Sequence, residues 1–332
     1  MLWIEKYRPE SLGGVVGQEQ VVAHLLRFAT ERSLPHLLVT GPHGTGKSAA
    51  IEGLARALYG AGWVENTTVL DATSLFVQGK ASLASDDRFA HLYRKDEGLS
   101  VNFKRIVRWY ASLQPLDARF KILVLEGAHS LPREIQQALR RTMERYSATC
   151  RFVLCTTNPS GIIPALGSRC LPLGFAPLEP ALVLATLGRI LDAEAPGKRE
   201  EIGEELEFIV HASGGDLRKA TLLLQVLVES GKGVGMAEIA TSETGNVALQ
   251  LVRAMRAGDN GLAQRTAESL LIDYGLSGKE FLREVHRAVR QEYHDPRIIR
   301  ILGETDASLG RAGNSFVQVN AMIARIIGEV FT

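Results

Sequence analysis

The chain of 332 residues has little cysteine, no excess of charge of one sign and no long apolar run. Its cysteines, Cys150, Cys155 and Cys170, are too few for a four-ligand zinc site, and their odd number argues against a framework of disulfides. Lys and Arg number 38 against 37 Asp and Glu, which excludes a basic tail or a strongly acidic protein. We therefore expect reduced thiols, and any contact with nucleic acid has to come from local placement of charge.

No segment reaches the roughly 18 uninterrupted apolar residues that a membrane span needs. The first twelve residues contain acids and a proline where a secretory signal has an apolar run. These features predict a cytoplasmic protein without a membrane partner. The chain is long enough for two or three domains, since domains commonly have about 100–200 residues.

The first half of the chain alternates short apolar runs with helical patterns. The apolar runs lie at 37–39, 67–72, 120–126, 151–157 and 170–175. Strands that alternate with helices predict a parallel sheet covered by helices on both faces, which is the α/β class.

After about residue 176 the strand patterns stop, and glycine-rich breaks separate helical patterns. We predict a nucleotide-binding domain at 1–175, a small helical domain at 176–235 and an all-helical domain at 236–332.

Two segments need a choice between interpretations. In the last expected helix, about 314–331, apolar residues recur every three or four positions and could face another helix, but packing within its own domain is the more ordinary interpretation. The members of that seam are Phe316, Val319, Ile323, Ile326 and Val330. The polar, serine-rich stretch 72–98 is expected to be an excursion from the core.

Residues 41–48, with the sequence GPHGTGKS, follow an apolar run and precede a helical pattern, which is the context of a phosphate-binding loop. Its glycines let backbone N–H groups turn onto phosphate oxygens, and the following helix adds its positive N-terminal end. Lys47 reaches the terminal phosphates, and Ser48 can bind a magnesium ion. The residues predicted to bind ATP or ADP here are Gly41, Pro42, His43, Gly44, Thr45, Gly46, Lys47 and Ser48.

The apolar run 120–126 ends in Glu126 and is followed by Gly127, where a nucleotide-hydrolysing protein usually has two acids. Glu126 can serve as the acid on the Mg²⁺ side, but a glycine has no side chain to orient or deprotonate the attacking water. Loss of a general base typically costs about 10²–10⁴-fold in rate. His129 could replace the base, although a histidine in a turn is more often a solvated surface group.

Five ordered segments together resemble the small subunit of replication factor C, the sliding-clamp loader of archaea and eukaryotes. These segments are 3–18, 34–48, 136–147, 167–170 and 214–220. The similarity runs from residue 3 to about 230, and the helical remainder fits the family's collar. The resemblance implies a P-loop AAA+ sheet domain, a small helical lid and a helical collar that joins subunits.

The resemblance also implies an activity and its partners. In the family, small and large subunits form a hetero-oligomer that loads the sliding clamp (PCNA) onto primer-template DNA during replication, without reading the DNA sequence. The complex is a DNA-dependent ATPase that uses ATP and Mg²⁺. The location implied is the cytoplasm of an archaeal cell.

Residue roles follow from the positions that match the family's motifs. The N-terminal segment is implied to lie against the adenine, with Tyr7, Arg8, Pro9, Val16 and Gly17. Thr157 aligns with the residue that senses the terminal phosphate, and its neighbour Asn158 is the alternative. Arg218 matches the arginine that reaches the nucleotide from the lid, although an exposed arginine at the start of a helix is the blander interpretation.

Arg169 matches the family's arginine finger, which enters the nucleotide site of the adjacent subunit. Such a finger is typically worth about 10³–10⁵ in rate; a surface arginine without function is the alternative. Lys104 and Arg108 lie one turn apart within 101–113, and Lys104 aligns with a residue that contacts the DNA backbone in the family. Contacts of this kind position a duplex without reading its sequence, and a merely solvated basic face is a close alternative.

The chain departs from the family in its acid pair, in a turn reduced to KDEG at 95–98 and in the longer segment before that turn. These departures put hydrolysis in doubt and leave binding intact. The leading hypothesis is a small subunit that binds ATP, hydrolyses it poorly and donates Arg169 to a neighbour. The alternatives are an active ATPase with a substitute base and a nucleotide-insensitive scaffold.

Overall fold

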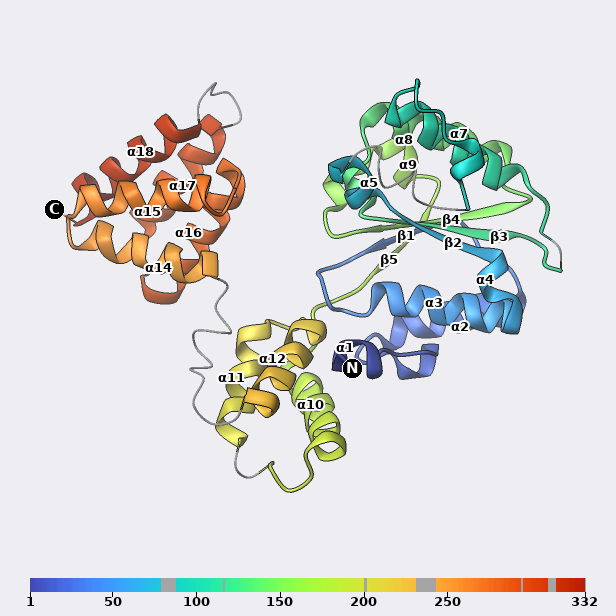
Figure 1. Cartoon of the computed structure of the whole chain (residues 1–332), viewed down its shortest axis with the longest axis horizontal. Helices are drawn as coiled ribbons and strands as arrows, with labels where there is room; N and C mark the ends of the chain where they lie inside the picture. Colours follow the sequence, from blue (N-terminus) through green and yellow to red (C-terminus); the bar gives the residue numbers. More distant parts are fainter. Residues whose placement is uncertain are drawn as a thin grey trace. The chain divides into compact units, whose positions relative to one another are not determined.

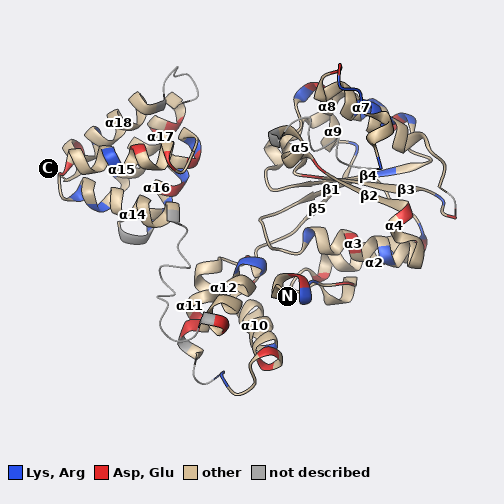
Figure 2. Cartoon of the chain, viewed as in Figure 1, with Lys and Arg blue, Asp and Glu red and all other residues tan. Residues whose placement is uncertain are grey.

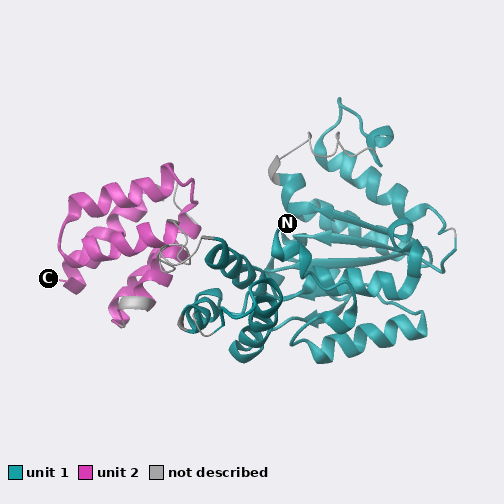
Figure 3. Ribbon diagram, turned by 60° about the horizontal axis from the view of Figure 1, so that its bottom comes forward, with its two compact units in different colours: residues 1–229 teal, residues 230–332 magenta. Residues whose placement is uncertain are grey.

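The computed structural model describes residues 1–78, 88–115, 117–199, 202–230, 243–293, 295–309 and 315–331. The chain divides into two compact units, residues 1–229 and 230–332 (Figure 3). The predicted boundary near residue 235 lies outside the described residues. The first unit contains both the sheet and the helices that follow it. The predicted domain boundary at residue 175 therefore stays a prediction.

The first unit contains a five-stranded parallel sheet in the order β2-β3-β4-β1-β5 (Figure 1). The strands are β1 (Leu37–Thr40), β2 (Thr67–Asp71), β3 (Lys121–Glu126), β4 (Cys150–Thr156) and β5 (Leu171–Gly174). Each strand lies on a predicted apolar run, which confirms the α/β prediction. Because the strands are parallel, the loop after β1 and the acid at the end of β3 lie at the same edge of the sheet.

Helices cover both faces of this sheet (Figure 1). On one face lie α2 (Glu19–Glu31) and α3 (Lys47–Tyr59), and on the other lie α5 (Ala72–Gln78), α7 (Leu99–Ser112) and α8 (Arg133–Arg145). Along β3, Ile122 and Val124 belong to the core with α2 and α3, whereas Leu123 and Leu125 belong to the core with α7 and α8. A strand buried on both faces needs apolar residues at every position, which explains the continuous run in the sequence.

The remaining helices of this unit precede the sheet, connect its strands or follow it. They are α1 (Trp3–Lys6), α4 (Trp63–Asn66), α9 (Pro164–Gly167), α10 (Pro180–Glu194), α11 (Gly203–Ser213) and α12 (Leu217–Ser230), with 3₁₀ turns at Leu12–Gly14, Gly60–Gly62, Ala90–Leu92, Ala128–Ser130 and Pro159–Gly161. The N-terminal helix is tied to the lid helices, because Gln225 Oε1 accepts a hydrogen bond from the Trp3 N–H at 2.8 Å and the Tyr7 hydroxyl donates to Glu194 Oε1 at 2.6 Å.

The second unit consists of helices in its described part. They are α14 (Glu243–Arg256), α15 (Asn260–Ile272), α16 (Gly278–Glu292), α17 (Pro296–Leu309) and α18 (Ser315–Ile326), with a π-helical turn at Ile327–Phe331. Val319, Ile323 and Ile326 are buried in the core of this unit, which confirms packing within the domain for most of the predicted seam. No helix in the described ranges has the length and apolarity to span a membrane.

The prediction that 72–98 is an excursion from the core is wrong for its described part. Ala72 and Leu75 of α5, together with Phe89, are buried in the core around α7. Phe76 adds an edge-on contact with Phe103 at 5.6 Å between ring centroids. A few well-spaced apolar side chains anchor this polar segment, while residues 79–87 lie outside the described residues.

Candidate nucleotide-binding site

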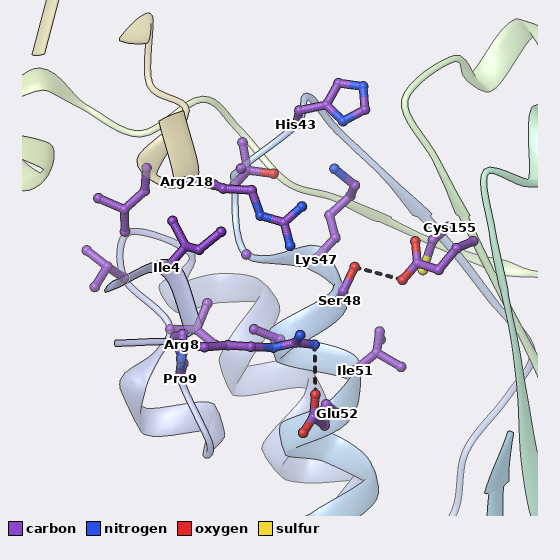
Figure 4. A pocket seen from close by; sticks show the side chains of 18 of the residues that line it. Ile4, Arg8, Pro9, His43, Lys47, Ser48, Ile51, Glu52, Cys155 and Arg218 are labelled. Carbon is purple, nitrogen blue, oxygen red and sulfur yellow. Dashed lines mark hydrogen bonds and ion pairs between the residues drawn. The ribbon is translucent and has the colours of Figure 1, made fainter. Parts of the chain in front are cut away.

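A pocket of about 1040 Å³ opens at the carboxyl edge of the sheet between the phosphate loop, the N-terminal segment and the lid helices (Figure 4). This volume is sufficient for a nucleotide. The predicted residues that line it are Tyr7, Arg8, Pro9, Val16, His43, Gly44, Thr45, Gly46, Lys47, Ser48, Glu126, Thr157 and Arg218. Those outside its lining are Gly17, Gly41, Pro42, Asn158, Arg169, Lys104 and Arg108.

The start of α12 lies directly on the phosphate loop. Gly44 has a φ of +65°, and a Cβ added to it would lie 1.6 Å from Asp216 Oδ1. The Gly44 carbonyl accepts a hydrogen bond from the Leu217 N–H at 3.3 Å. A glycine is therefore required at position 44, and this contact brings the next residue, Arg218, to the pocket.

Besides Arg8, three cations line the pocket: Lys47, Arg189 and Arg218. Lys47 is buried, and burial lowers the pKa of its ammonium group, which donates to the Pro42 carbonyl. Within the described ranges, no carboxylate lies within 4.0 Å of these three cations. Figure 4 shows Lys47 and Arg218 on two sides of one space. Cations without carboxylate partners around a glycine-rich loop are suited to an anion such as a polyphosphate.

Two residues predicted to bind magnesium, Ser48 and Glu126, lie together in the pocket. The Ser48 hydroxyl donates to Glu126 Oε1 at 2.7 Å (Figure 4). The described part of the chain has no cluster of three or more His, Cys, Asp or Glu that could hold a metal. Mg²⁺ usually combines one or two protein oxygens with phosphate and water. The pair therefore fits a nucleotide-bound magnesium ion.

The N-terminal wall of the pocket is more apolar. Trp3 and Ile190 are buried there and accompany Tyr7, Pro9 and Val16. The guanidinium of Arg8 is paired with Glu52 at 2.8 Å, so its charge is partly neutralised by the protein. A flat nucleobase can bury its faces against such a wall.

His129 is half-buried and lines the pocket, so its interpretation as a solvated surface group is wrong. Its Nδ1 lies 3.0 Å from Thr156 Oγ1. Burial and the nearby His43 lower the pKa of His129, so its imidazole is neutral at neutral pH. A neutral imidazole is the form that can accept a proton.

Among the pocket residues that escaped prediction from the sequence, three have polar or charged side chains that bear on its chemistry: Arg189, Asp71 and Thr73. Arg189 is the only charged residue within 181–191, and a lone arginine on an apolar helix is a signal that could have identified it. Asp71 is the last residue of β2 and pairs in register with Glu126, and Thr73 lies two residues further on in α5. Their position depends on the strand order, which has no local signature in the sequence.

Arg169 lies away from the chain's own pocket. Its guanidinium donates to Glu144 Oε1 at 2.6 Å and to the Ala165 carbonyl at 2.7 Å. One third of the side chain is exposed. The end of α8 therefore holds this arginine in place on the surface of the first unit.

The predicted DNA-contacting residues lie on one face of α7. Lys104 forms an ion pair with Glu134, while Arg108 is exposed and has no ion pair with any described residue. Both line a groove with Trp109 and Tyr146. Elsewhere, the helices of both units carry Asp and Glu as well as Lys and Arg (Figure 2). The basic face of α7 is therefore a local feature of the surface.

Four features together define a nucleotide-binding protein of the P-loop AAA+ class. They are the strand order, the phosphate loop after β1, the acid at the end of β3 and the helical lid. Residues 17–179 match the family model described as DNA polymerase III, delta subunit, and residues 246–325 match the one described as Replication factor C C-terminal domain.

Comparison with individual proteins extends the match to nearly the whole chain. The replication factor C small subunit of Staphylothermus marinus is 33% identical over 98% of this chain and 94% of that protein. The one of Aeropyrum pernix is 34% identical over 98% of this chain and 95% of that protein. This chain therefore belongs to the family of replication factor C small subunits.

A solved structure supports the fold alone. The Aeropyrum pernix ORC1 protein, solved in complex with DNA, superimposes with a TM-score of 0.55 at 16% identity. The match covers 98% of this chain and 87% of that protein.

Proposed function

We propose that this chain is a clamp-loader subunit that binds ATP with Mg²⁺, hydrolyses it poorly and completes the ATP site of a neighbouring subunit. The observation that carries the proposal is the pocket itself. Lys47, Arg189 and Arg218 in its lining lack carboxylate partners among the described residues, whereas Gly127 offers no second acid beside Glu126. Such a site favours a bound polyphosphate and lacks the usual activator of water.

Each part of the pocket has a role in binding. The backbone amides of the loop, Lys47, Arg189 and Arg218 neutralise the phosphates, and the wall around Tyr7 and Val16 takes the base. Ser48 and Glu126 hold Mg²⁺, which supplies charge neutralisation at the phosphates when bound. Thr157 lines the pocket and Asn158 does not, which favours Thr157 as the residue that senses the terminal phosphate.

The partners proposed are other small and large subunits, the sliding clamp (PCNA) and primer-template DNA. The exposed position of Arg169 outside the chain's own pocket supports its action on a neighbour's ATP. Arg108 is the stronger candidate for DNA phosphate contact, because Lys104 is already paired with Glu134.

ATP binding is tested by Lys47→Ala. Equilibrium titration of the full chain with ATP and Mg²⁺ should show at least about tenfold weaker binding in the variant, since a lost charge-assisted contact costs about 1.5–3 kcal/mol. Arg108→Ala, which changes a cation outside the pocket, should bind as the unchanged chain does. Equal affinity in all three proteins would favour a nucleotide-insensitive scaffold.

The role in trans is tested by Arg169→Ala in the assembled complex. ATP hydrolysis at the adjacent site, isolated by phosphate-loop Lys→Ala changes in the other subunits, should fall at least about 10³-fold. Arg141→Ala, which changes an exposed arginine on the same helix as Glu144, serves as the matched control. An unchanged rate with Arg169→Ala would remove the donor role.

A second candidate function is hydrolysis in the chain's own site with His129 as the base. The observation that favours it is the position of His129 in the pocket lining, where burial lowers its pKa and its Nδ1 lies 3.0 Å from Thr156 Oγ1. The purified chain with clamp and primed DNA should then turn over ATP, and His129→Ala should abolish the turnover. Absence of turnover in the unchanged chain argues for the first proposal.

A further inference from the structure

The backbone at Gly127 leaves no room for a side chain. Its φ of +60° lies in the left-handed region, which residues other than Gly, Asn and Asp seldom adopt. A Cβ added there would lie 2.0 Å from Thr73 Oγ1 and 3.1 Å from Thr73 Cβ. The first distance is far shorter than any non-bonded contact, so Thr73 occupies space that any side chain at position 127 needs.

Thr73 is held in this place from two directions. Asp71 Oδ1 accepts hydrogen bonds from the N–H groups of Thr73 at 2.9 Å and of Ser74 at 3.3 Å, which fixes the turn from β2 into α5. On the other side, Thr73 Oγ1 lies 3.2 Å from Ser130 Oγ, in the 3₁₀ turn after Gly127. The hydroxyl of Thr73 therefore bridges the two turns that follow neighbouring strands.

We propose that Thr73 is a positioning residue that keeps a water-activating carboxylate out of this nucleotide site. The proposal rests on the proposed function, ATP binding with poor hydrolysis. A threonine hydroxyl is not a base at neutral pH, so Thr73 fills the place of a general base without its chemistry. The poor hydrolysis is then a property of the turn after β2 as well as of Gly127, and an acid introduced at 127 alone does not restore activity.

The first test needs no nucleotide. Gly127→Asp is made in the unchanged full chain and in a Thr73→Ala background, and the melting temperature is measured for each. Aspartate tolerates the left-handed region, so the comparison isolates the overlap with Thr73. We expect Gly127→Asp to lower the melting temperature by several degrees beside Thr73 and by less than half as much in the Thr73→Ala background.

The matched control for this test is a Thr73→Val background, which keeps the branched shape and removes the hydroxyl. The drop caused by Gly127→Asp should persist there if the obstacle is steric. Equal drops in the unchanged and the Thr73→Ala backgrounds would overturn the proposal.

The second test measures hydrolysis. In an assembled complex whose other ATP-binding subunits carry Lys→Ala in their phosphate loops, single-turnover hydrolysis reports this site alone. We expect the double variant Thr73→Ala/Gly127→Asp to hydrolyse ATP at least about tenfold faster than Gly127→Asp alone, because a general base typically contributes about 10²–10⁴. Thr73→Ala/Gly127→Asn, which has the same shape without the carboxylate, should show no such gain.

The outcomes separate this inference from the function on which it rests. A full gain of rate from Gly127→Asp alone, or no gain from the double variant, overturns the role of Thr73. Rapid hydrolysis by the unchanged site overturns the proposed poor hydrolysis instead, and the melting temperatures still decide whether Thr73 excludes a side chain at 127.

Discussion

At the residue scale, single contacts decide which chemistry each side chain of the first unit can perform. Ser48 and Glu126 come from separate elements and meet at 2.7 Å, so the glutamate lies beside the serine that is predicted to bind magnesium. His129 lies inside the pocket, where burial and His43 keep its imidazole neutral at neutral pH. The residue types were visible in the sequence, but their environments were not.

His36 shows how an environment changes a titration. The backbone N–H of Phe152 donates to His36 Nδ1 at 3.0 Å, and the two rings pack edge-on with centroids 5.5 Å apart. Burial, followed by the charge of Arg151, lowers the pKa of His36 from its usual 6.5 to about 4. His36 therefore binds a proton less tightly in the folded protein than in the unfolded chain.

The first prediction concerns the pH dependence that His36 causes. The pKa of His36 is lower in the folded protein than in the unfolded chain. Its contribution to the free energy of unfolding is therefore complete above about pH 6.5 and is lost as the pH falls toward about 4. The full loss is about 3.5 kcal/mol, from roughly 1.4 kcal/mol per pKa unit. Denaturant unfolding between pH 7 and pH 4.5 should show a shallower decline in His36→Asn, whose amide oxygen can still accept from Phe152. Identical declines in the two proteins would contradict this assignment.

At the scale of elements, periodicity predicted the strands and failed for the segment around α5. Both ends of each strand lie within one residue of the ends of a predicted apolar run, because a strand buried on both faces needs apolar side chains throughout. The segment 72–98 carries only a few apolar residues among many polar ones. Leu75 and Phe89 are nevertheless buried, because they pack against the amphipathic helix α7.

Helix α16 begins with a capping box, which supports a second prediction. Glu280 N–H donates to Ser277 Oγ at 3.3 Å, and Ser277 N–H donates to Glu280 Oε2 at 2.9 Å. Ser277→Ala should lower the free energy of unfolding of the second unit by about 1 kcal/mol, since it leaves an N-terminal amide without a partner. Urea unfolding followed by circular dichroism measures the change.

Ser308→Ala is the control for this measurement. Its hydroxyl is exposed and donates to the Glu304 carbonyl within α17, so its loss should change the stability by less than about 0.5 kcal/mol. Equal effects of Ser277→Ala and Ser308→Ala would show that the cap contributes nothing specific.

At the scale of the whole molecule, the nucleotide site belongs to one compact unit. Every residue that lines the pocket lies before residue 230, and that unit has its own cores on both faces of the sheet. The second unit has a separate helical core and matches the family's C-terminal domain over residues 246–325. The lining of the pocket and the core of the second unit thus come from separate parts of the chain.

The third prediction follows from this separation. A fragment ending at Glu229 should fold and bind ATP with a Kd within about threefold of that of the full chain. Circular dichroism establishes folding, and equilibrium titration gives the Kd. A folded fragment that has lost ATP binding would show that the second unit takes part in the site.

The sequence by itself determined the phosphate loop, the strands and the family. Consecutive backbone amides and a helix start bind phosphate, so the residues 41–48 carry this function in their local order. Only the tertiary structure decided that Asp71 stands beside Glu126 and that Thr73 fills the space at Gly127. Strand register and the packing of distant turns depend on contacts between residues far apart in the chain, and no local pattern of residues encodes them.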